Sequence, residues 1–366
     1  MFFRCFSGIF FYFFSYFLIG DYLNKFVFFL ILIIFPIFVY ADSSYSTVVM
    51  EMSSGRVLYS KRPNKPMLIA SITKIMTCIV VLENSDLNEQ VTVGEEILNM
   101  YGTSLYLKVG EVLTVRDLLY GLMLRSGNDA AIVLAFHIAG SEEKFVQKMN
   151  QKAKEIGMTN TIFQNSHGLD DETKNYSTAY DMALLSQYAY HNSIYQKIVK
   201  TKKYQTKSSL KSYIWYNRMS LLRQYDFCIG GKNGYTPKAG KTLVSLAQKN
   251  GMTLTVVSLD DSNIYDNHKE LYEKYFSRYQ MYKIISKDFF SKSSNYYLKR
   301  TFSYPLKENE KDYINTFLNI GSVRKNRIVG NIKIQLYNKT IGNISIYEKE
   351  IKKEKKNSFF SKLIRS

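Results

Sequence analysis

The chain has 366 residues, of which 46% are hydrophobic, so it is long enough to bury a sizeable core and to form more than one domain. Its 49 Lys and Arg residues outnumber the 31 Asp and Glu residues and give a formal net charge of +18, which suits an anionic partner. The sequence has no zinc-finger spacing, RNP-like motif or Arg-rich arm, so we do not expect nucleic acid to be that partner.

The N-terminal segment, residues 1–41, predicts a leader peptide that directs export. Lys25 precedes an apolar run over residues 26–40, and the small-x-small ending at Ala41 is typical of a leader-peptidase site. We therefore expect cleavage after Ala41. An uncleaved anchor is the competing interpretation, although the run is shorter than the roughly 20 residues that a membrane span needs.

The next part of the chain, residues 42–285, predicts one α+β domain. Helices are expected in its middle, and they cover residues 69–83, 114–139 and 141–156. Strands are expected at its two ends, and they cover residues 47–52, 56–59, 242–247 and 253–259. Strands at both ends of a helical middle predict a sheet that is closed by distant segments.

A change of composition near Ser286 predicts a second, small all-β domain over residues 286–347. Its clearest signal is a run of Ile and Leu that alternates with polar residues, turns at Asn338 and Lys339, and returns in the same pattern. The alternating apolar residues are Ile332, Ile334, Leu336, Ile344 and Ile346.

The last segment, residues 348–366, predicts a basic amphipathic tail. Its apolar residues gather on one side of a short helix with Lys and Arg beside them, and they are Phe359, Phe360, Leu363 and Ile364. This side is too short to span a bilayer but is suited to lying on an anionic membrane surface. A disordered basic tail is the alternative.

The three cysteines are too few for a disulfide framework, and Cys5 lies in the predicted leader. Cys78 falls in an apolar helical run and Cys228 beside a strand-like run. We therefore expect both to be buried free thiols.

Ser71 and Lys74 form the first motif with catalytic chemistry. Their i,i+3 spacing places the hydroxyl and the amine on one face of the predicted helix. The lysine can act as a base only if burial lowers its pKa from about 10.4 toward neutrality. A helix N-cap is the ordinary alternative for Ser71. The same Ser-x-x-Lys spacing also begins at Ser141, Ser208 and Ser322.

Two further motifs follow the first. Ser126 and Asn128 interrupt a helical segment at a tight turn, where a hydroxyl and an amide can point into a cleft. Lys232, Asn233 and Gly234 precede a strand-forming segment, and they supply a cation and a glycine that lets a ligand approach a strand edge. The ordinary alternatives are an interhelical turn and a hairpin turn with a solvated lysine.

With these motifs in this order, the chain resembles the D-alanyl-D-alanine carboxypeptidases, the low-molecular-mass penicillin-binding proteins of the serine DD-peptidase superfamily. The likeness extends over most of the sequence after the leader and includes residues 53–77, 103–131, 165–185 and 230–247. It implies a β-lactamase/DD-peptidase-like α+β domain, with a central antiparallel sheet and a helical subdomain, followed by a small all-β domain. From the predicted leader and tail we expect the protein to be exported and to lie on the outer face of the cytoplasmic membrane or in the cell-wall space.

The resemblance implies serine peptidase chemistry on a peptidoglycan stem peptide that ends in D-Ala-D-Ala, and acylation by β-lactams. Ser71 would be acylated, Lys74 would take the serine proton, and Ser126 would relay a proton to the leaving D-Ala. Water would then hydrolyse the ester, so neither a metal nor an organic cofactor is required.

The resemblance also implies the residues that bind the substrate. Asn128 would hold the substrate amide, Lys232 would attract the terminal carboxylate, and the backbone N–H groups of Ser71 and Tyr235 would form the oxyanion hole. Asn233 departs from the family, which usually has Thr at this position. Because Asn can still donate to a carboxylate, we expect activity to survive with altered preference.

Three alternatives come from other classes. A class A β-lactamase needs a glutamate-held water, and the surroundings of Glu172 lack the usual Glu-x-x-Leu-Asn pattern. A wall-binding or β-lactam-sensing module would result if Asn233 had disabled turnover. A nucleotide-binding loop before Lys241 is excluded, because a P-loop needs glycine at the position of Tyr235.

Overall fold

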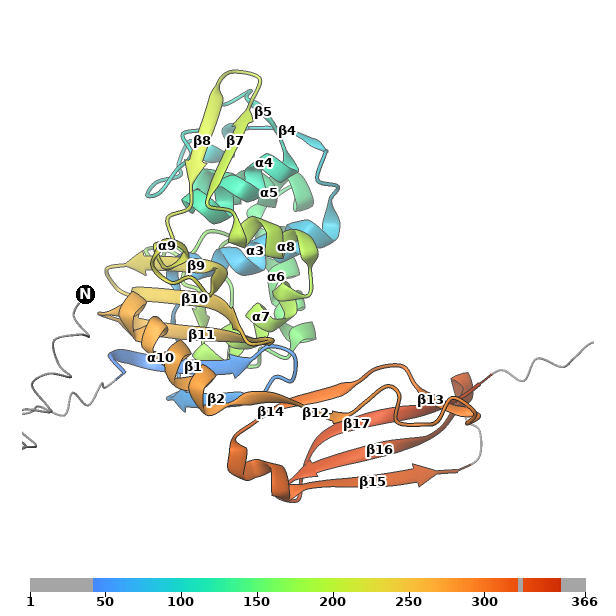
Figure 1. Ribbon diagram of the computed structural model, residues 1–366. Helices are drawn as coiled ribbons and strands as arrows, with labels where there is room; N and C mark the ends of the chain where they lie inside the picture. Colours follow the sequence, from blue (N-terminus) through green and yellow to red (C-terminus); the bar gives the residue numbers. More distant parts are fainter. Residues whose placement is uncertain (1–41, 322–324, 350–366) are drawn as a thin grey trace, which may run out of the picture. The chain divides into compact units, whose positions relative to one another are not determined.

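The computed structural model describes residues 42–321 and 325–349 (Figure 1). The predicted leader and nearly all of the predicted basic tail therefore lie outside the described residues. The helices and strands below belong to the unit Ser43–Ser366. None of the helices in the described ranges is both long and apolar enough to cross a membrane.

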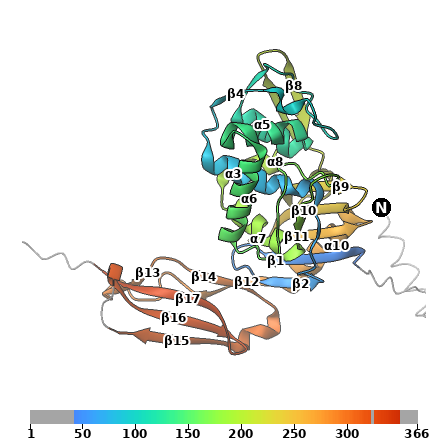
Figure 2. The same cartoon turned by 180° about the vertical axis from the view of Figure 1, so that it is seen from behind.

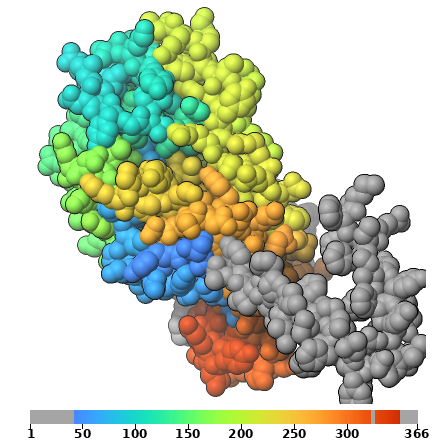
Figure 3. Space-filling model, turned by 90° about the vertical axis from the view of Figure 1, so that its left-hand side faces the viewer, coloured from blue at the N-terminus to red at the C-terminus, as the bar shows by residue number. Residues whose placement is uncertain are grey.

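A five-stranded antiparallel sheet, ordered β2-β1-β11-β10-β9, organises the larger part of this unit. The strands are β1 (Ser44–Glu51), β2 (Val57–Lys61), β9 (Cys228–Thr236), β10 (Gly240–Lys249) and β11 (Met252–Asp261). The predicted closure by distant segments is confirmed, because Val48 of β1 lies opposite Val257 of β11. Figure 3 shows these N-terminal and later segments adjoining, in blue and orange.

The central strands are buried on both faces. Val48 and Val257 belong to one hydrophobic cluster, and their neighbours Val49 and Val256 belong to another. Because successive side chains of a strand point to opposite faces, the sheet separates two cores. Helix α10 (Ile264–Arg278) contributes its buried side chains to the second core.

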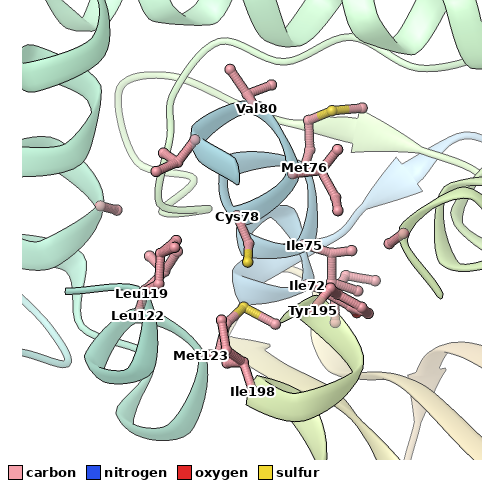
Figure 4. Packing of buried hydrophobic residues seen from close by; sticks show 14 of the residues in the cluster. Ile72, Ile75, Met76, Cys78, Val80, Leu119, Leu122, Met123, Tyr195 and Ile198 are labelled. Carbon is pink, nitrogen blue, oxygen red and sulfur yellow. The ribbon is translucent and has the colours of Figure 1, made fainter. Parts of the chain in front are cut away.

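The first core is formed by helices around α3 (Lys74–Asn84). The other helices are α4 (Val115–Tyr120), α5 (Asn128–Ala139), α6 (Glu142–Ile156), α7 (Ala179–Tyr190) and α8 (Ser193–Lys200), whereas the short α9 (Leu221–Gln224) packs into the second core. Every residue of α3 from Lys74 to Val81 is buried, as expected of a helix at the centre of a core. Figure 4 shows side chains from other helices, among them Met123 and Tyr195, packed around it.

This part of the chain also contains three short antiparallel strand pairs. They are β3 (Met67–Leu68) with β6 (Tyr176–Ser177), β4 (Gln90–Thr92) with β5 (Val112–Thr114), and β7 (Lys203–Lys207) with β8 (Ser212–Tyr216). The cysteine prediction is confirmed, because Cys78 and Cys228 are both free and buried. Burial raises the pKa of both thiols, so they are chemically quiet.

The C-terminal part is all β. A four-stranded sheet runs in the order β13 (Tyr296–Leu298), β17 (Lys339–Glu348), β16 (Ile328–Leu336) and β15 (Ile314–Ile320), and β12 (Gln280–Ile285) pairs with β14 (Phe302–Leu306). The predicted alternation is confirmed, and the turn lies one residue earlier, at Tyr337 and Asn338. Because β12 precedes residue 286 but pairs beyond it, the boundary there stays a prediction.

Phe145 tests how much the helical core contributes to stability. Its ring is fully buried in the first core, whereas Phe289 is 49% exposed. We expect Phe145→Ala to lower the free energy of unfolding by about 3–5 kcal/mol through loss of burial and a residual cavity. Phe289→Ala is the matched control and should change it by about 0.5 kcal/mol or less. Urea unfolding of both variants checks this, and equal losses would contradict it.

Candidate active site

Ser71 lies in a 3-10 turn, Ala70–Thr73, that leads directly into α3. The predicted helix over residues 69–83 is therefore α-helical only from Lys74. The N-cap of the turn is Ile69, and no side chain caps either the turn or α3, so the ordinary interpretation of Ser71 as a cap is wrong. Ala70 has φ of 49°, a conformation rare outside glycine that often marks a functional site.

Lys74 connects three segments of the site. Its Nζ donates to Ser71 Oγ at 3.3 Å, to Asn128 Oδ1 at 2.7 Å and to the backbone oxygen of His167. The side chain is fully buried, and burial together with the charge of Lys232 holds the pKa of Lys74 well below its usual range. A neutral amine beside a hydroxyl can take the proton of that hydroxyl.

Ser126 and Asn128 lie where one helix stops and the next begins. The α4 helix continues as a single π turn, Gly121–Arg125, and Ser126 follows with left-handed backbone, φ 63°, before α5 starts. The predicted interruption is therefore confirmed. Both side chains are buried, and Asn128 Nδ2 donates to the backbone oxygen of Tyr101 at 2.7 Å. Asn128 thus ties the second motif to Lys74 and to the loop at Tyr101.

Lys232, Asn233 and Gly234 precede the predicted strand, which is part of β10, but they themselves lie within β9, an edge strand that the sequence did not predict. The three glycines of β9 lower its strand propensity, which is why the sequence did not predict a strand there. Lys232 is 1% exposed, so the alternative of a solvated lysine is wrong. Burial, and then the nearby charge of Arg218, lower the pKa of Lys232 to about 7.

Gly234 and Gly168 bring two segments against the turn that carries Ser71. A Cβ atom at Gly234 would lie 2.7 Å from the backbone nitrogen of Ser71 and 2.6 Å from Thr242 Oγ1. A Cβ atom at Gly168, whose φ is 90°, would lie 2.1 Å from the backbone oxygen of Ala70. Only glycine fits either contact. The edge of β9 therefore runs directly beside the N–H of Ser71, and the next residue, Tyr235, is exposed.

The competing Ser-x-x-Lys sequences have ordinary roles. Ser141 is the N-cap of α6, and its hydroxyl accepts a hydrogen bond from the backbone N–H of Lys144 at 3.3 Å. The hydroxyl of Ser208 accepts one from the backbone N–H of Lys211 at 3.1 Å in a turn. Ser322 lies outside the described residues. Only the pair at Ser71 joins its hydroxyl to the lysine amine among these described pairs.

The sequence analysis gave no role to His167 or Arg218. The loop of His167 is held in place by Glu142, which accepts hydrogen bonds from Ser166 N–H at 2.8 Å and from Ser166 Oγ at 2.6 Å. Burial and then the Lys74 charge lower the pKa of His167 to about 3, so its ring is neutral. His167 lies in residues 165–185, one of the segments that resemble the family, and this resemblance was the signal that could have marked it. Arg218 donates to Thr103 Oγ1 at 3.1 Å, and no sequence pattern marked it.

Metal ligation has no candidate in the described ranges, where no cluster of three His, Cys, Asp or Glu side chains is arranged for it. At Ser71 the hydroxyl lies beside the Lys74 amine, whose pKa burial holds well below its usual range, and Asn128 binds the same amine. A hydroxyl beside an amine of lowered pKa is an arrangement that can generate a serine nucleophile.

Comparison with known proteins identifies the family to which this chain belongs. The sequence profile of the D-alanyl-D-alanine carboxypeptidase family matches residues 40–263, more than half of the chain. The chain belongs to this family. D-alanyl-D-alanine carboxypeptidase DacF of Bacillus subtilis is 37% identical over 223 residues, which are 59% of this chain and 57% of that relative. DacC of Escherichia coli is 37% identical over 58% of this chain and 55% of its own length. The chain thus spans just over half the length of these relatives.

Solved structures of the family share the fold. The D-alanyl-D-alanine carboxypeptidase DacD from Francisella tularensis has a TM-score of 0.66 and 25% identity, over 87% of this chain and 95% of that chain. Penicillin binding protein 5 from Haemophilus influenzae has a TM-score of 0.72 over 85% of this chain and 98% of that chain, and at 24% identity it shows the fold alone. The predicted fold class, including the small all-β domain, is confirmed.

Lys232 makes the stability of the protein depend on pH. Its pKa is about 7 in the folded chain against an ordinary 10.5, so unfolding takes up a proton between these values and stability rises with pH there. We expect Lys232→Met to reduce this rise, since only Lys74 then contributes a strongly lowered lysine pKa. Urea midpoints at pH 7, 8 and 9 measure it. Parallel curves for the parent and the variant would contradict the burial of a titrating amine.

Proposed function

We propose that the protein is a serine-type D-Ala-D-Ala carboxypeptidase that removes the terminal D-Ala from peptidoglycan stem pentapeptides. The same serine, Ser71, is acylated by β-lactams. The observation that carries the proposal is the fully buried Lys74 amine, whose pKa is held well below its usual range, 3.3 Å from Ser71 Oγ. Membership of the family supports this substrate class.

In the proposed acylation, Lys74 takes the proton of Ser71 Oγ, which attacks the carbonyl carbon of the penultimate D-Ala. The N–H groups of Ser71 and Tyr235 receive the developing oxyanion, a pairing supported by the close approach of Gly234 to the Ser71 nitrogen. As the peptide bond breaks, Ser126 gives its proton to the leaving D-Ala nitrogen and receives in exchange the proton that Lys74 took from Ser71, so the amine is neutral again. Water then cleaves the ester and restores the serine.

The proposed binding of the substrate uses the edge of β9 and the start of α5. Asn128 holds the substrate amide, with its side chain already fixed between Lys74 and the Tyr101 backbone. Lys232 attracts the terminal carboxylate, and Arg218 adds charge beside it. Asn233 supplies an amide donor where the family usually has a hydroxyl, and activity survives with an altered substrate preference or β-lactam affinity.

The alternatives remain distinguishable. A β-lactamase is the weaker one, because Glu172 is exposed and so lacks the enclosed setting in which a carboxylate holds a hydrolytic water. A β-lactam-sensing or wall-binding protein disabled by Asn233 would still be acylated but would not turn over. Steady-state release of D-Ala from a pentapeptide separates the enzyme from the sensor.

The proposed site of action is the outer face of the cytoplasmic membrane or the cell-wall space, which the predicted leader supports. The catalytic domain is assigned to residues 42–285 and the small β domain to residues 286–347. The basic tail, residues 348–366, would hold the protein on an anionic membrane surface, and it rests on the sequence alone.

Ser71→Ala tests the nucleophile. We expect release of D-Ala from a muramyl pentapeptide to fall by at least about a thousandfold, because no other group can form the acyl-enzyme. The single adduct that a labelled penicillin forms should also disappear from the intact-protein mass spectrum. Ser141→Ala is the matched control, since its serine caps α6 and should leave both measurements unchanged. An adduct that persists in Ser71→Ala would overturn the assignment.

Lys74→Arg tests the base. A guanidinium keeps the positive charge but does not deprotonate, so we expect the rate of acylation by penicillin to fall by about a hundredfold or more. Lys144→Arg makes the same change in the capping Ser-x-x-Lys sequence and should leave the rate unaltered. Stopped-flow acylation measures both variants. A rate within threefold of the parent for Lys74→Arg would contradict its role as base.

A further inference from the structure

The strand β15 forms one edge of the C-terminal sheet (Figures 1 and 2). It pairs with β16 along its whole length, from Ile314 opposite Leu336 to Ile320 opposite Gly330, without a register shift. Within residues 42–321 and 325–349, no strand pairs with its other edge. A regular edge of this kind presents unpaired backbone N–H and C=O groups to any further strand.

This edge lacks the usual protection against pairing. Proteins commonly guard an edge strand with a charged side chain, a proline or a bulge. The seven residues of β15, INTFLNI, contain neither charge nor proline, and the strand has no bulge. The chain as a whole carries a net charge of +18, but this strand carries none. It is a place where two copies can meet without opposing like charges.

The strand also leaves apolar side chains uncovered. Leu318 lies opposite Ile332, so both point to the same face, yet Leu318 is 50% exposed whereas Ile332 is buried. The exposed Ile320 continues this face, and Phe317 is 48% exposed on the other face. The core face of the sheet therefore runs on to β15 without a cover among the described residues, and a further strand would bury it.

The sequence of β15 is nearly the same in both directions. If two copies pair antiparallel about Phe317, Phe317 meets Phe317 of the second copy, and Ile314 meets Ile320 of the second copy. Asn315 then meets Asn319 of the second copy, so amides face amides. Thr316 meets Leu318 of the second copy on the core face. A twofold interface needs this self-complementarity, because each contact occurs twice with the partners exchanged.

We propose that the partner of β15 is a second copy of this chain, bound antiparallel about Phe317 so that the two sheets become one. The pairing is independent of the proposed catalytic function, because it uses only the C-terminal sheet. Two other occupants of the edge can be separated by experiment: residues 350–366 of the same chain, and a different protein.

The first experiment is chemical crosslinking. It uses the protein expressed from the full sequence, after any N-terminal processing by the expressing cell. Phe317→Cys places a thiol at the twofold axis, and Phe289→Cys places one at a site of matched exposure, 49% against 48%. Cys5→Ser is added to both variants, and the native Cys78 and Cys228 are buried. With a short bis-maleimide, we expect Phe317→Cys to give several times more covalent dimer than Phe289→Cys. Equal yields would overturn the proposal.

The second experiment tests the register. Asn315→Lys with Asn319→Lys places like charges opposite each other twice, whereas Asn315→Lys with Asn319→Glu places opposite charges there, and both asparagines are exposed in the single chain. We expect the first double variant to dimerise at least about tenfold more weakly than the second in sedimentation velocity. Equal dimerisation, a parent that stays monomeric at all concentrations, or dimers that form only after removal of residues 350–366 would each overturn the proposal.

Discussion

The structure depends on an amine buried at the start of the central helix. Lys74 is fully enclosed by α3 and its neighbours, and a charged ammonium group is costly to bury unless several acceptors surround it. The chain meets this need with oxygens from three distant segments: the turn before α3, the start of α5 and the loop at His167. The oxygens that offset the cost of burying the Lys74 amine therefore also hold it beside the Ser71 hydroxyl.

A second buried lysine, Lys232, influences the protonation of Lys74. Lys232 lies on the edge strand and is as enclosed as Lys74, and its charge lowers the pKa of Lys74 further. Two buried amines in one site disfavour simultaneous protonation, so the pair can supply one neutral base and one cation. The carboxylate of a ligand would favour the charged form of Lys232. In the proposed mechanism, Lys232 is the amine that binds this carboxylate.

Two sheet edges serve this molecule in different ways. At the edge of β9, Gly234 lets the strand run directly beside the backbone of Ser71. The edge of β15 is long, neutral and apolar, and its near-palindromic sequence suits a copy of itself. The same backbone geometry would thus serve the proposed ligand recognition at one edge and the proposed association at the other.

The sequence by itself determined the local elements and the chemistry-bearing residues. The β1–β2 and β10–β11 hairpins, the α6 helix from its Ser141 cap to Gly157, and the break at Ser126 follow from periodicity and turn residues, which act over short distances. The sequence motifs also marked Ser71 and Lys74 correctly as a contacting pair, because an i,i+3 spacing is enough to bring two side chains together.

Only the tertiary structure decided which environment each of these residues receives. It placed Lys232 inside a strand and out of water, brought the His167 carbonyl to Lys74, and set Gly234 against Ser71. These contacts join residues far apart in the chain, and burial depends on what packs over a residue rather than on its neighbours in sequence. Periodicity carries no information on either, so the pKa shifts that make the chemistry feasible emerge only when the sheet and the helices close around α3.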